Sequence, residues 1–341
     1  MQPVSIVGRA GELAELTHAW SALAEGGRAA PGAVVITGGA GTGKSLLVAT
    51  ALAAFAPRPC TVLSGAARVH TPAPYDWLAA VLTGRDTGDL PLPDDALAWL
   101  AQHPTTPRER YAPGALLRLA VRTVRALVGA GPAVLVVEDL HALDPASLNL
   151  LGELVTVPDL PALLVVASRP ADVAVSPQLA ARTLARLSGA PGAIRQHLGP
   201  LGRADVAAVL AQVYPRARVS ARVVDAVRER TGGNPYWLTE LLAARGSHGP
   251  DGLLDQPLPP HLRLAAGEPA PGAELTGREV EVLNCLASGM SNKQVARLLG
   301  ISIRTVTVHV SNLLRKTGSA SRTEAALWAV RHRLPSPNRG G

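Results

Sequence analysis

The chain has 341 residues, which is long enough for two or three domains with buried cores. Two cysteines, Cys60 and Cys285, exclude a disulfide framework, and without a signal-peptide pattern or an 18-residue apolar run we expect a cytoplasmic protein with no membrane span. The net charge of +7 is concentrated in residues 273–341, where ten Lys and Arg stand against four Glu, and this predicts a polyanionic partner for that region.

Short apolar runs recur in the first 200 residues, with helical stretches such as KSLLVATALAAFA and PGALLRLAVRTVRALVGA between them. Strands that are apolar along their whole length and alternate with helices are typical of a parallel sheet covered on both faces. Residues 1–200 are therefore predicted to form an α/β domain whose strands lie near 33–37, 61–64, 133–139, 162–168 and, more weakly, 193–198.

The first of these runs leads into a glycine-rich loop. In VVITGGAGTGKSLLVAT, the residues Gly38, Gly43, Lys44 and Ser45 satisfy the G-x-x-x-x-G-K-[ST] pattern of a P-loop NTPase between a strand and a helix. The glycines let backbone N–H groups surround a phosphate, Lys44 can reach the β- and γ-phosphates, and the Ser45 hydroxyl can ligate Mg²⁺. The residues of this loop predicted to bind ATP are Gly38, Gly39, Ala40, Gly41, Thr42, Gly43, Lys44, Ser45 and Leu46.

Polar residues follow two later strands. The run AVLVVED ends in Glu138 and Asp139, and LLVVASRP carries Arg169 at its end. One carboxylate should hold Mg²⁺ while the other polarises the attacking water, and Arg169 can sense the γ-phosphate. By position we assign Glu138 to the metal and Asp139 to catalysis, and the reverse assignment stays open. The predicted catalytic residues are Lys44, Asp139 and Arg169, and the predicted metal ligands are Ser45, Glu138 and Asp139.

Two histidines, His70 and His141, attract notice because histidine often serves as a catalytic base or a metal ligand. The spacing of Cys, His and carboxylate residues around them does not support a zinc site. We therefore predict structural or surface roles for both.

After residue 200 the pattern becomes helical, from GRADVAAVLAQV to PYWLTELLAARG, and predicts a lid-like subdomain over 201–245. The stretch 245–272 holds six prolines and five glycines without a sustained period, so we place a linker at 246–272. The end of the chain, 334–341, is predicted to be disordered.

Four segments of this part of the chain, taken in order with the P-loop, resemble one family: IVGRAGELAEL, VVEDLHALDPASLNLL, LLVVASRP and RTGGNPYWLTELL. They are similar to the AAA-like STAND signalling ATPases at the amino ends of large LuxR-type bacterial activators, over about residues 4–245. The resemblance implies that Val7, Gly8 and Arg9 lie near the nucleotide base. It also implies that the lid turn at 233–235 closes over the nucleotide, with Pro235 in contact with ATP.

Residues 273–333 are rich in signals for helix starts and ends. Capping boxes open at Thr276, Ser291 and Ser321, each with Glu or Gln three residues later. Gly300 fits a tight turn after the second of these helices. We therefore predict an all-helical domain here.

The segment ISIRTVTVHV, residues 301–310, alternates like an edge strand, but its place after the turn favours a helix. A helix over 301–317 would have Ser302 as its N-cap and would bury Val306, Val310 and Leu313 on one face. A short helix, a glycine turn and this second helix together make a helix-turn-helix.

From LTGREVEVLNCLASG to SRTEAALWAV, about residues 275–330, the sequence closely resembles the LuxR/GerE-type DNA-binding domain. The resemblance implies that the helix from Ser302 enters the major groove of double-stranded DNA. It also implies a dimer face around Trp328, although Trp328 can equally be a core residue. The residues expected to contact DNA are Ser291, Asn292, Lys293, Arg304, Thr305, Thr307, Val308, His309, Ser311, Asn312, Arg315 and Lys316.

Lysine is rare in this chain, with three Lys among 33 basic residues. All three, Lys44, Lys293 and Lys316, fall on positions to which the two resemblances assign a binding role. At such positions a compact ammonium group can serve better than a guanidinium. Thr307 is a departure, because the LuxR-type family usually carries Lys there. A threonine can offer a hydroxyl and a methyl to a base edge but makes no long ionic contact with a phosphate.

Two departures concern the ATPase part. The STAND family usually has two aspartates where this chain has Glu138 and Asp139, which leaves the rate of hydrolysis more open than the binding of ATP. Large activators of this type also place a helical-repeat sensor between the ATPase and the DNA-binding domain. Here only the linker stands there, so the input would come through a partner or has been lost.

Together these predictions describe a DNA-binding transcriptional regulator, expected to be an activator, in which ATP with Mg²⁺ and slow hydrolysis act as a switch. The expected partners are promoter DNA, further copies of the chain in a homodimer or oligomer, and RNA polymerase. Two alternatives stay open. One is a DNA-stimulated motor or loader ATPase, and the other is a constitutive promoter-binding module with a vestigial ATPase.

Overall fold

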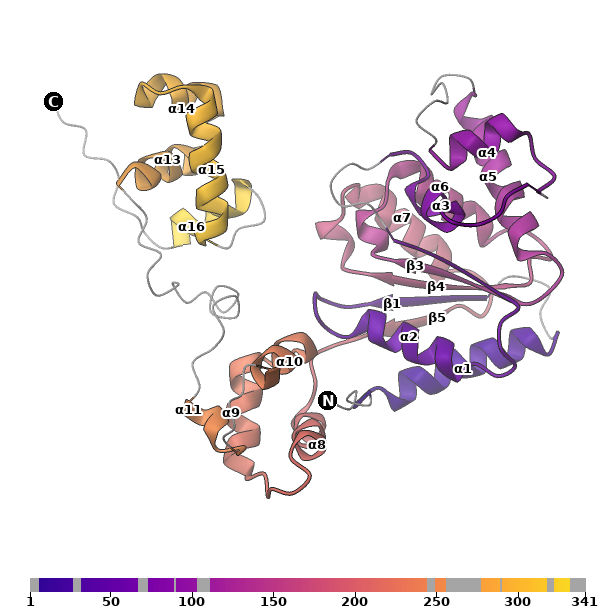
Figure 1. Ribbon diagram of the computed structural model, residues 1–341, viewed down its shortest axis with the longest axis horizontal. Coiled ribbons are helices and arrows are strands. Elements are labelled where there is room, and N and C mark those ends of the chain that lie inside the picture. Colours follow the sequence, from indigo (N-terminus) through magenta and orange to yellow (C-terminus); the bar gives the residue numbers. More distant parts are fainter. Residues whose placement is uncertain are drawn as a thin grey trace. The chain divides into compact units, whose positions relative to one another are not determined.

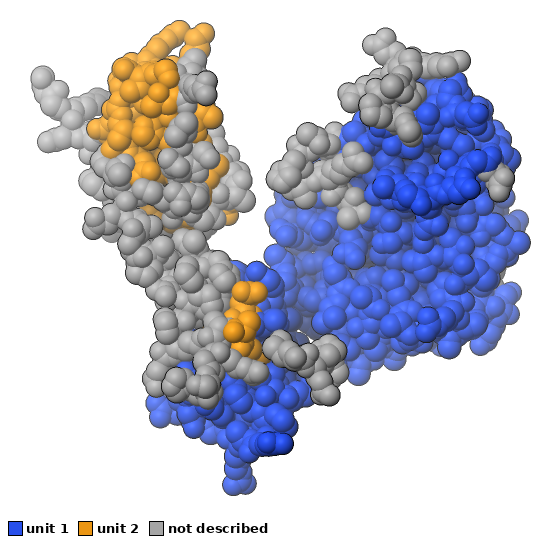
Figure 2. Space-filling model, in the orientation of Figure 1, with its two compact units in different colours: residues 1–239, 249–254 blue, residues 240–248, 255–341 orange. Residues whose placement is uncertain are grey.

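The computed structural model describes residues 6–26, 32–66, 73–88, 90–102, 111–243, 249–255, 277–288, 290–317 and 322–331. The chain divides into two compact units, residues 1–239 with 249–254 and residues 240–248 with 255–341 (Figure 2). The capping boxes predicted at Thr276 and Ser321 and the predicted tail 334–341 lie outside the described residues. Within the described part of the chain, no helix is long and apolar enough to cross a membrane.

The first unit is built on a sheet of five parallel strands in the order β2-β3-β4-β1-β5 (Figure 1). The chain leaving β1 runs to β2 at one edge of the sheet, whereas the chain leaving β4 crosses to β5 at the other edge. Neighbouring strands that send the chain in opposite directions open a crevice at their carboxyl ends. The strands are β1 (Gly32–Thr37), β2 (Thr61–Ala66), β3 (Ala133–Glu138), β4 (Ala162–Ser168) and β5 (Ile194–His197).

The central strands bury side chains on both faces, as their uninterrupted apolar character predicts. In β1, Ala33 and Val35 belong to one hydrophobic cluster, and Val34 and Ile36 belong to another on the opposite face. The second cluster is covered by α1 (Ala10–Ala24) and α2 (Lys44–Ala54). The first is covered by α3 (Asp76–Leu82), α4 (Asp94–Leu100), α5 (Pro113–Val128), α6 (Pro145–Leu154) and α7 (Pro177–Ser188) (Figure 1).

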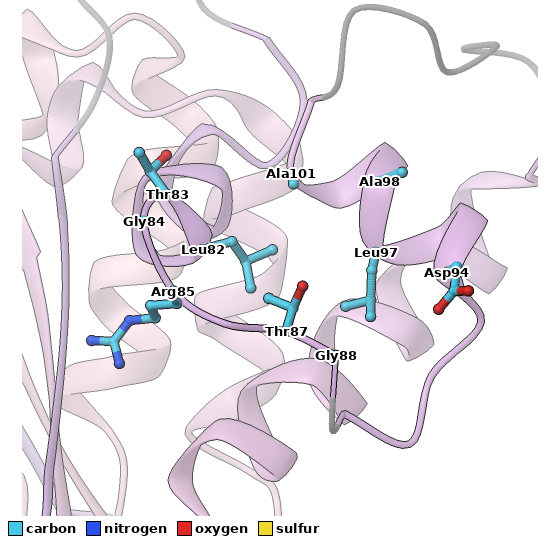
Figure 3. A pocket seen from close by; sticks show the side chains of 10 residues that line it. All are labelled: Leu82, Thr83, Gly84, Arg85, Thr87, Gly88, Asp94, Leu97, Ala98 and Ala101. Atoms are coloured by element: carbon cyan, nitrogen blue, oxygen red, sulfur yellow. The ribbon is translucent and has the colours of Figure 1, made fainter.

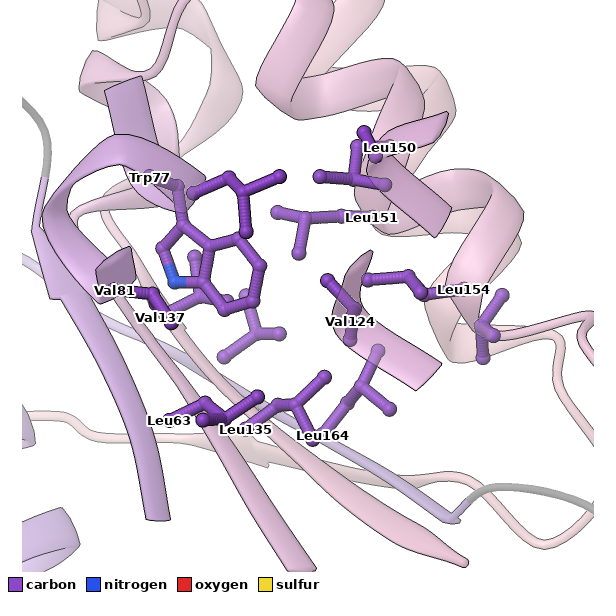
Figure 4. Close-up of a cluster of buried hydrophobic side chains, with 14 of the residues drawn as sticks. Leu63, Trp77, Val81, Val124, Leu135, Val137, Leu150, Leu151, Leu154 and Leu164 are labelled. Atoms are coloured by element: carbon purple, nitrogen blue, oxygen red, sulfur yellow. The ribbon is translucent and has the colours of Figure 1, made fainter. Parts of the chain in front are cut away.

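Trp77 is the largest side chain in the first cluster and is fully buried. Figure 4 shows the indole ring of Trp77, which projects from α3 toward the strands that carry Leu135 and Val137. Its Nε1 donates a hydrogen bond to the carbonyl oxygen of Val136 at 2.9 Å, so the one polar atom of the ring is satisfied. Burying each large apolar side chain here contributes about 1.5–3 kcal/mol, and the sheet therefore provides a rigid platform for its edge loops.

A group of short helices follows the sheet. These are α8 (Arg203–Val213), α9 (Ala221–Thr231) and α10 (Pro235–Ala243), and an ion pair of 2.6 Å between Arg203 and Asp225 joins the first two. A further turn, α11 (Gly252–Asp255), lies inside the stretch predicted to be linker. Leu253 in this turn is buried, and its carbonyl oxygen accepts a hydrogen bond from Arg230 of α9. The described residues 249–255 of the predicted linker thus include a helical turn that buries Leu253.

The second unit contains α13 (Gly277–Ala287), α14 (Asn292–Leu299), α15 (Ile303–Thr317) and α16 (Arg322–Arg331). Val306 and Leu313 of α15 are fully buried in a shared core, and Val310 packs against it. The hydroxyl oxygen of Ser302 accepts a hydrogen bond from the backbone N–H of Thr305 at 3.1 Å, as an N-cap does. The structure confirms the helix predicted over 301–317 and the helix-turn-helix.

Candidate functional site

The glycine-rich loop between β1 and α2 has a backbone that only glycine adopts easily. Gly38, Gly41 and Gly43 have φ angles of +155°, +73° and +91°. A Cβ atom at Gly38 would lie 2.6 Å from the carbonyl oxygen of Leu198, so a side chain has no room there. These angles turn successive peptide groups around one centre at the start of α2, where the helix dipole favours an anion.

Lys44 is buried at the first position of α2, with 8% of its surface exposed. Its ammonium group donates hydrogen bonds to the carbonyl oxygens of Gly38 at 2.9 Å and Gly39 at 2.7 Å. Burial lowers the pKa of Lys44, and the charge of Arg169 lowers it further, while Asp139 opposes this effect. The ammonium thus lies inside the loop, within reach of an anion held by the loop amides.

Glu138 and Asp139 are adjacent at the end of β3, but their side chains have different surroundings. Glu138 accepts a hydrogen bond from the Ser45 hydroxyl, with 2.6 Å between the two oxygens. Asp139 has a left-handed backbone with φ of +51°, and its side chain is 57% exposed. The P-loop and the end of β3 are therefore joined by the hydrogen bond between Ser45 and Glu138.

His141 joins the ends of β3 and β4. Its Nδ1 accepts a hydrogen bond from the backbone N–H of Arg169 at 3.3 Å, so the neutral ring carries its proton on Nε2. Burial lowers the pKa of His141, while Asp139, 3.9 Å away, raises it and the charges of Arg169 and Lys44 lower it. The sequence contains no spacing that could place His141 here, because the contact depends on which strands are neighbours.

A cavity of about 310 Å³ opens beside the loop. Most of the residues predicted for the phosphate site line this cavity. Two further lining residues, Tyr236 and Thr239, were not predicted from the sequence. Tyr236 directly follows the predicted Pro235 on α10, which is the one signal that could have indicated it. The lining residues are Ala40, Gly41, Thr42, Gly43, Lys44, Ser45, Leu46, Asp139, Arg169, Pro235, Tyr236 and Thr239.

The predicted base contacts Val7, Gly8 and Arg9 are not among the residues that line this cavity. A Cβ atom at Gly8 would lie 2.6 Å from the Asp205 carboxylate, which places this residue against the start of α8. The Arg9 guanidinium is buried and donates a hydrogen bond to the carbonyl oxygen of Gly199. The segment 7–9 therefore contacts the start of α8 and the residues that lead from β5 to it.

A larger cavity of about 540 Å³ lies between α3 and α4 (Figure 3). The apolar side chains of Leu82 and Leu97 and the polar side chains of Thr87 and Asp94 line it (Figure 3). It contains none of the predicted site residues and no glycine-rich loop at a helix start. Chemistry rather than volume therefore makes the smaller cavity the candidate nucleotide site.

In the second unit, Lys293, Thr305 and Thr307 are exposed and His309 is half-buried. Ser291 forms a capping box with Gln294, and Trp328 is partly buried against the domain core. Trp328 thus contributes to the core, and its predicted place on a dimer face stays a prediction. Other predicted DNA contacts lie on α14 or α15, but the described part of the structure does not include the side chains of Arg304, Val308, Ser311, Asn312, Arg315 and Lys316.

Comparison with known families assigns both units. A model of the AAA ATPase domain matches residues 5–166, and a model of bacterial regulatory proteins of the luxR family matches residues 273–329. The chain joins an AAA ATPase domain to a LuxR-family helix-turn-helix domain. The comparison confirms the AAA-type ATPase domain and the LuxR-type domain, while the STAND class of the ATPase stays a prediction.

Curated relatives of this AAA–LuxR chain are transcriptional regulators by name. The uncharacterized transcriptional regulatory protein YhcZ of Bacillus subtilis is 44% identical over 100 residues, which are 28% of this chain and 47% of that protein. The transcriptional regulatory protein LiaR of the same organism is 32% identical over 115 residues, 34% of this chain and 48% of that protein. The chain thus spans less than half the length of these relatives.

Among solved structures, the Aeropyrum pernix ORC1 protein in complex with DNA matches 97% of the AAA–LuxR chain and 94% of its own chain. The TM-score is 0.51 and the sequence identity is 13%. At this identity the likeness shows the fold alone.

Proposed function

We propose that this chain is a transcriptional regulator of the STAND type, in which ATP and Mg²⁺ at the P-loop control promoter binding by the LuxR-family domain. The observation that carries the proposal is the hydrogen bond between Ser45 and Glu138, which joins the P-loop to the acidic end of β3. It supports a working nucleotide site rather than a glycine-rich turn. The presence of a LuxR-family domain on the same chain supports DNA as the output.

The side chains beside the P-loop are of the types that bind a nucleotide together with Mg²⁺. Among the residues that the structure describes, no group of three or more His, Cys, Asp or Glu could hold a metal ion alone. Mg²⁺ is usually held by one or two carboxylates together with substrate phosphates, and Ser45, Glu138 and Asp139 match this pattern. When bound, the ion would draw charge from the phosphate oxygens.

Three side chains would carry the slow hydrolysis. Asp139, exposed at the cavity wall, would orient and polarise the attacking water. Lys44 would exchange its loop carbonyl partners for phosphate oxygens, and Arg169 would contact the γ-phosphate from the end of β4. The hydrogen bond that the Arg169 backbone N–H donates to His141 would keep Arg169 close to Asp139. Slow turnover suits a switch, because the bound state must last long enough to be read.

On the output side, the exposed residues Lys293, Thr305 and Thr307 of α14 and α15 would face double-stranded promoter DNA, with α15 in the major groove. We propose that the chain acts in the cytoplasm as a homodimer or a larger oligomer on DNA. Contact with RNA polymerase would make it an activator.

Genome-wide binding in cells tests the proposal. Lys44→Ala removes the ammonium from the P-loop and should reduce promoter occupancy and transcription from the bound promoters by at least about fivefold. Lys293→Ala, on the DNA side, should reduce occupancy while leaving nucleotide binding by the purified protein unchanged.

Two outcomes would favour the alternatives. Unchanged occupancy and transcription in the Lys44→Ala variant would indicate a constitutive DNA-binding module. Fast ATP turnover that rises further with DNA would indicate a motor or loader.

A further inference from the structure

The start of α10 is bonded directly to the P-loop. The side-chain amide Nδ2 of Asn234 donates a hydrogen bond to the carbonyl oxygen of Ala40 at 2.8 Å. The backbone N–H of Tyr236 donates to the carbonyl oxygen of Gly41 at 3.1 Å. A Cβ atom at Gly41 would lie 2.7 Å from both Asn234 and Tyr236, so the contact needs glycine at this position. Two segments separated by 194 residues therefore meet at the backbone of the phosphate loop.

These two bonds fix the orientation of two peptide planes. The carbonyl of Ala40 shares a peptide group with the N–H of Gly41, and the carbonyl of Gly41 shares one with the N–H of Thr42. In a trans peptide the C=O and N–H point in opposite directions. When the carbonyls point to α10, the two N–H groups point away from it, and successive loop amides turned to one side can surround an anion. A hydrogen bond to the carbonyl also polarises the peptide and strengthens its N–H as a donor.

Asn234 has two separate tasks in this contact. Its side-chain oxygen accepts hydrogen bonds from the backbone N–H groups of Tyr236 at 2.9 Å and Trp237 at 3.4 Å, which caps α10. The N–H of Tyr236 is shared between this oxygen and the carbonyl oxygen of Gly41. The side-chain nitrogen of Asn234 makes the bond to Ala40. Ser or Asp at this position could cap the helix, but an ionised Asp has no donor for the loop, and the Ser hydroxyl is too short to cap the helix and reach Ala40.

We infer that Asn234 is a positioning residue through which the helical subdomain senses the phosphates of a bound nucleoside di- or triphosphate. This inference rests on the proposed nucleotide binding at the P-loop and adds the means by which the subdomain detects it. Docking of α10 pre-orients the amides of Gly41 and Thr42 for the phosphates. By linkage, phosphates on those amides strengthen the docking of α10 by the same factor. The coupling acts through the loop backbone, so it requires no contact between the nucleotide and Asn234 itself.

The substitution Asn234→Ser separates the two tasks, because a serine can cap α10 but is too short to reach Ala40 from the cap position. Binding of a fluorescent ADP analogue to the purified full chain should weaken about three- to tenfold, as expected for one lost hydrogen bond. Hydrogen exchange provides a second readout. In the unsubstituted chain, ADP should slow exchange of the amides at 236–238, and in the variant this slowing should be lost.

Two further variants complete the test. Ser220→Ala removes the N-cap of α9, where the Ser220 hydroxyl accepts a hydrogen bond from the N–H of Val223. Ser220 is not among the residues that line the cavity beside the P-loop. The substitution should lower the melting temperature without changing ADP affinity. Asn234→Ala loses both the cap and the donor, so it should show the affinity loss of Asn234→Ser together with a lower melting temperature.

The inference is overturned if Asn234→Ser binds the ADP analogue as tightly as the unsubstituted chain and keeps the ADP-dependent slowing of exchange at 236–238. It is also overturned if Ser220→Ala weakens ADP binding as much as Asn234→Ser does, since the effect would then be general loosening of the subdomain. Failure of the unsubstituted chain to bind the analogue at all would instead contradict the proposed nucleotide function.

Discussion

Glu138 and Asp139 are adjacent in the chain but have different partners. Glu138 is the last residue of β3, and its side chain reaches the Ser45 hydroxyl at 2.6 Å. Asp139 begins the next turn in a left-handed conformation and lines the cavity. A residue with a short polar side chain tolerates this backbone better than most, which gives a physical reason for Asp at the second position. We therefore keep the proposal that Glu138 serves the metal and Asp139 the reacting water.

Substitution of each carboxylate in turn tests this assignment. Glu138→Gln should weaken ADP binding about tenfold in Mg²⁺ and leave it unchanged in EDTA, because only the metal-dependent contact is lost. Asp139→Asn should leave ADP affinity in Mg²⁺ nearly unchanged but slow phosphate release from ATP about 10²- to 10⁴-fold. Titration with a fluorescent nucleotide and a phosphate-release assay measure the two effects. The opposite pattern would support the reverse assignment of the two residues.

Helix α15 shows how an element can carry a misleading pattern. Its segment 301–310 alternates like a strand, yet it is helical, because Ser302 caps it and Val306 is buried at helical spacing from Val310 and Leu313. The capping box and the glycine turn before it were sufficient to predict this from the sequence. By contrast, α11 was missed, since two adjacent Leu among prolines and glycines give no periodic signal. Its contact with Arg230 joins it to a helix more than twenty residues earlier in the chain.

Thr307 is exposed on α15, at the position where a LuxR-type domain usually has Lys. Thr307→Lys should add one phosphate contact and steepen the plot of log affinity against log salt by about one unit. Thr307→Ala serves as the matched control and should leave the slope unchanged. Fluorescence anisotropy of the full chain on a selected promoter fragment, over a series of salt concentrations, measures both. An unchanged slope in the lysine variant would mean that residue 307 does not face a phosphate.

For the whole molecule, the sequence predicted what is local and missed what depends on the order of the strands. The P-loop, the acidic end of β3 and the helix-turn-helix are continuous motifs, so the sequence could indicate where they lie. The DNA contacts were implied by the resemblance to the LuxR/GerE-type domain, and the roles of Glu138 and Asp139 stayed open. The contacts of His141 with Arg169 and of Asn234 with Ala40 join segments far apart in the chain. They exist because β3, β4 and β1 are neighbours in the sheet and because α10 returns to the loop after β1. Propensity and periodicity contain no information about such neighbours.

Those contacts all converge on the candidate nucleotide site, which lies in one unit, while the candidate DNA-binding helix lies in the other. The central claim is therefore a coupling between two separate sites, and thermodynamic linkage gives it a measurable form. A ligand at the P-loop must change the affinity for DNA, and DNA must change the affinity for the ligand by the same factor.

The most direct test is the dissociation constant of the full chain for a promoter fragment, selected from genomic DNA by the protein itself, with and without a slowly hydrolysed ATP analogue and Mg²⁺. The account predicts that the nucleotide tightens DNA binding by at least about fivefold. It also predicts that Lys44→Ala removes this difference while still binding DNA. Equal affinity for DNA with and without the analogue, in a chain shown to bind the analogue, would contradict it.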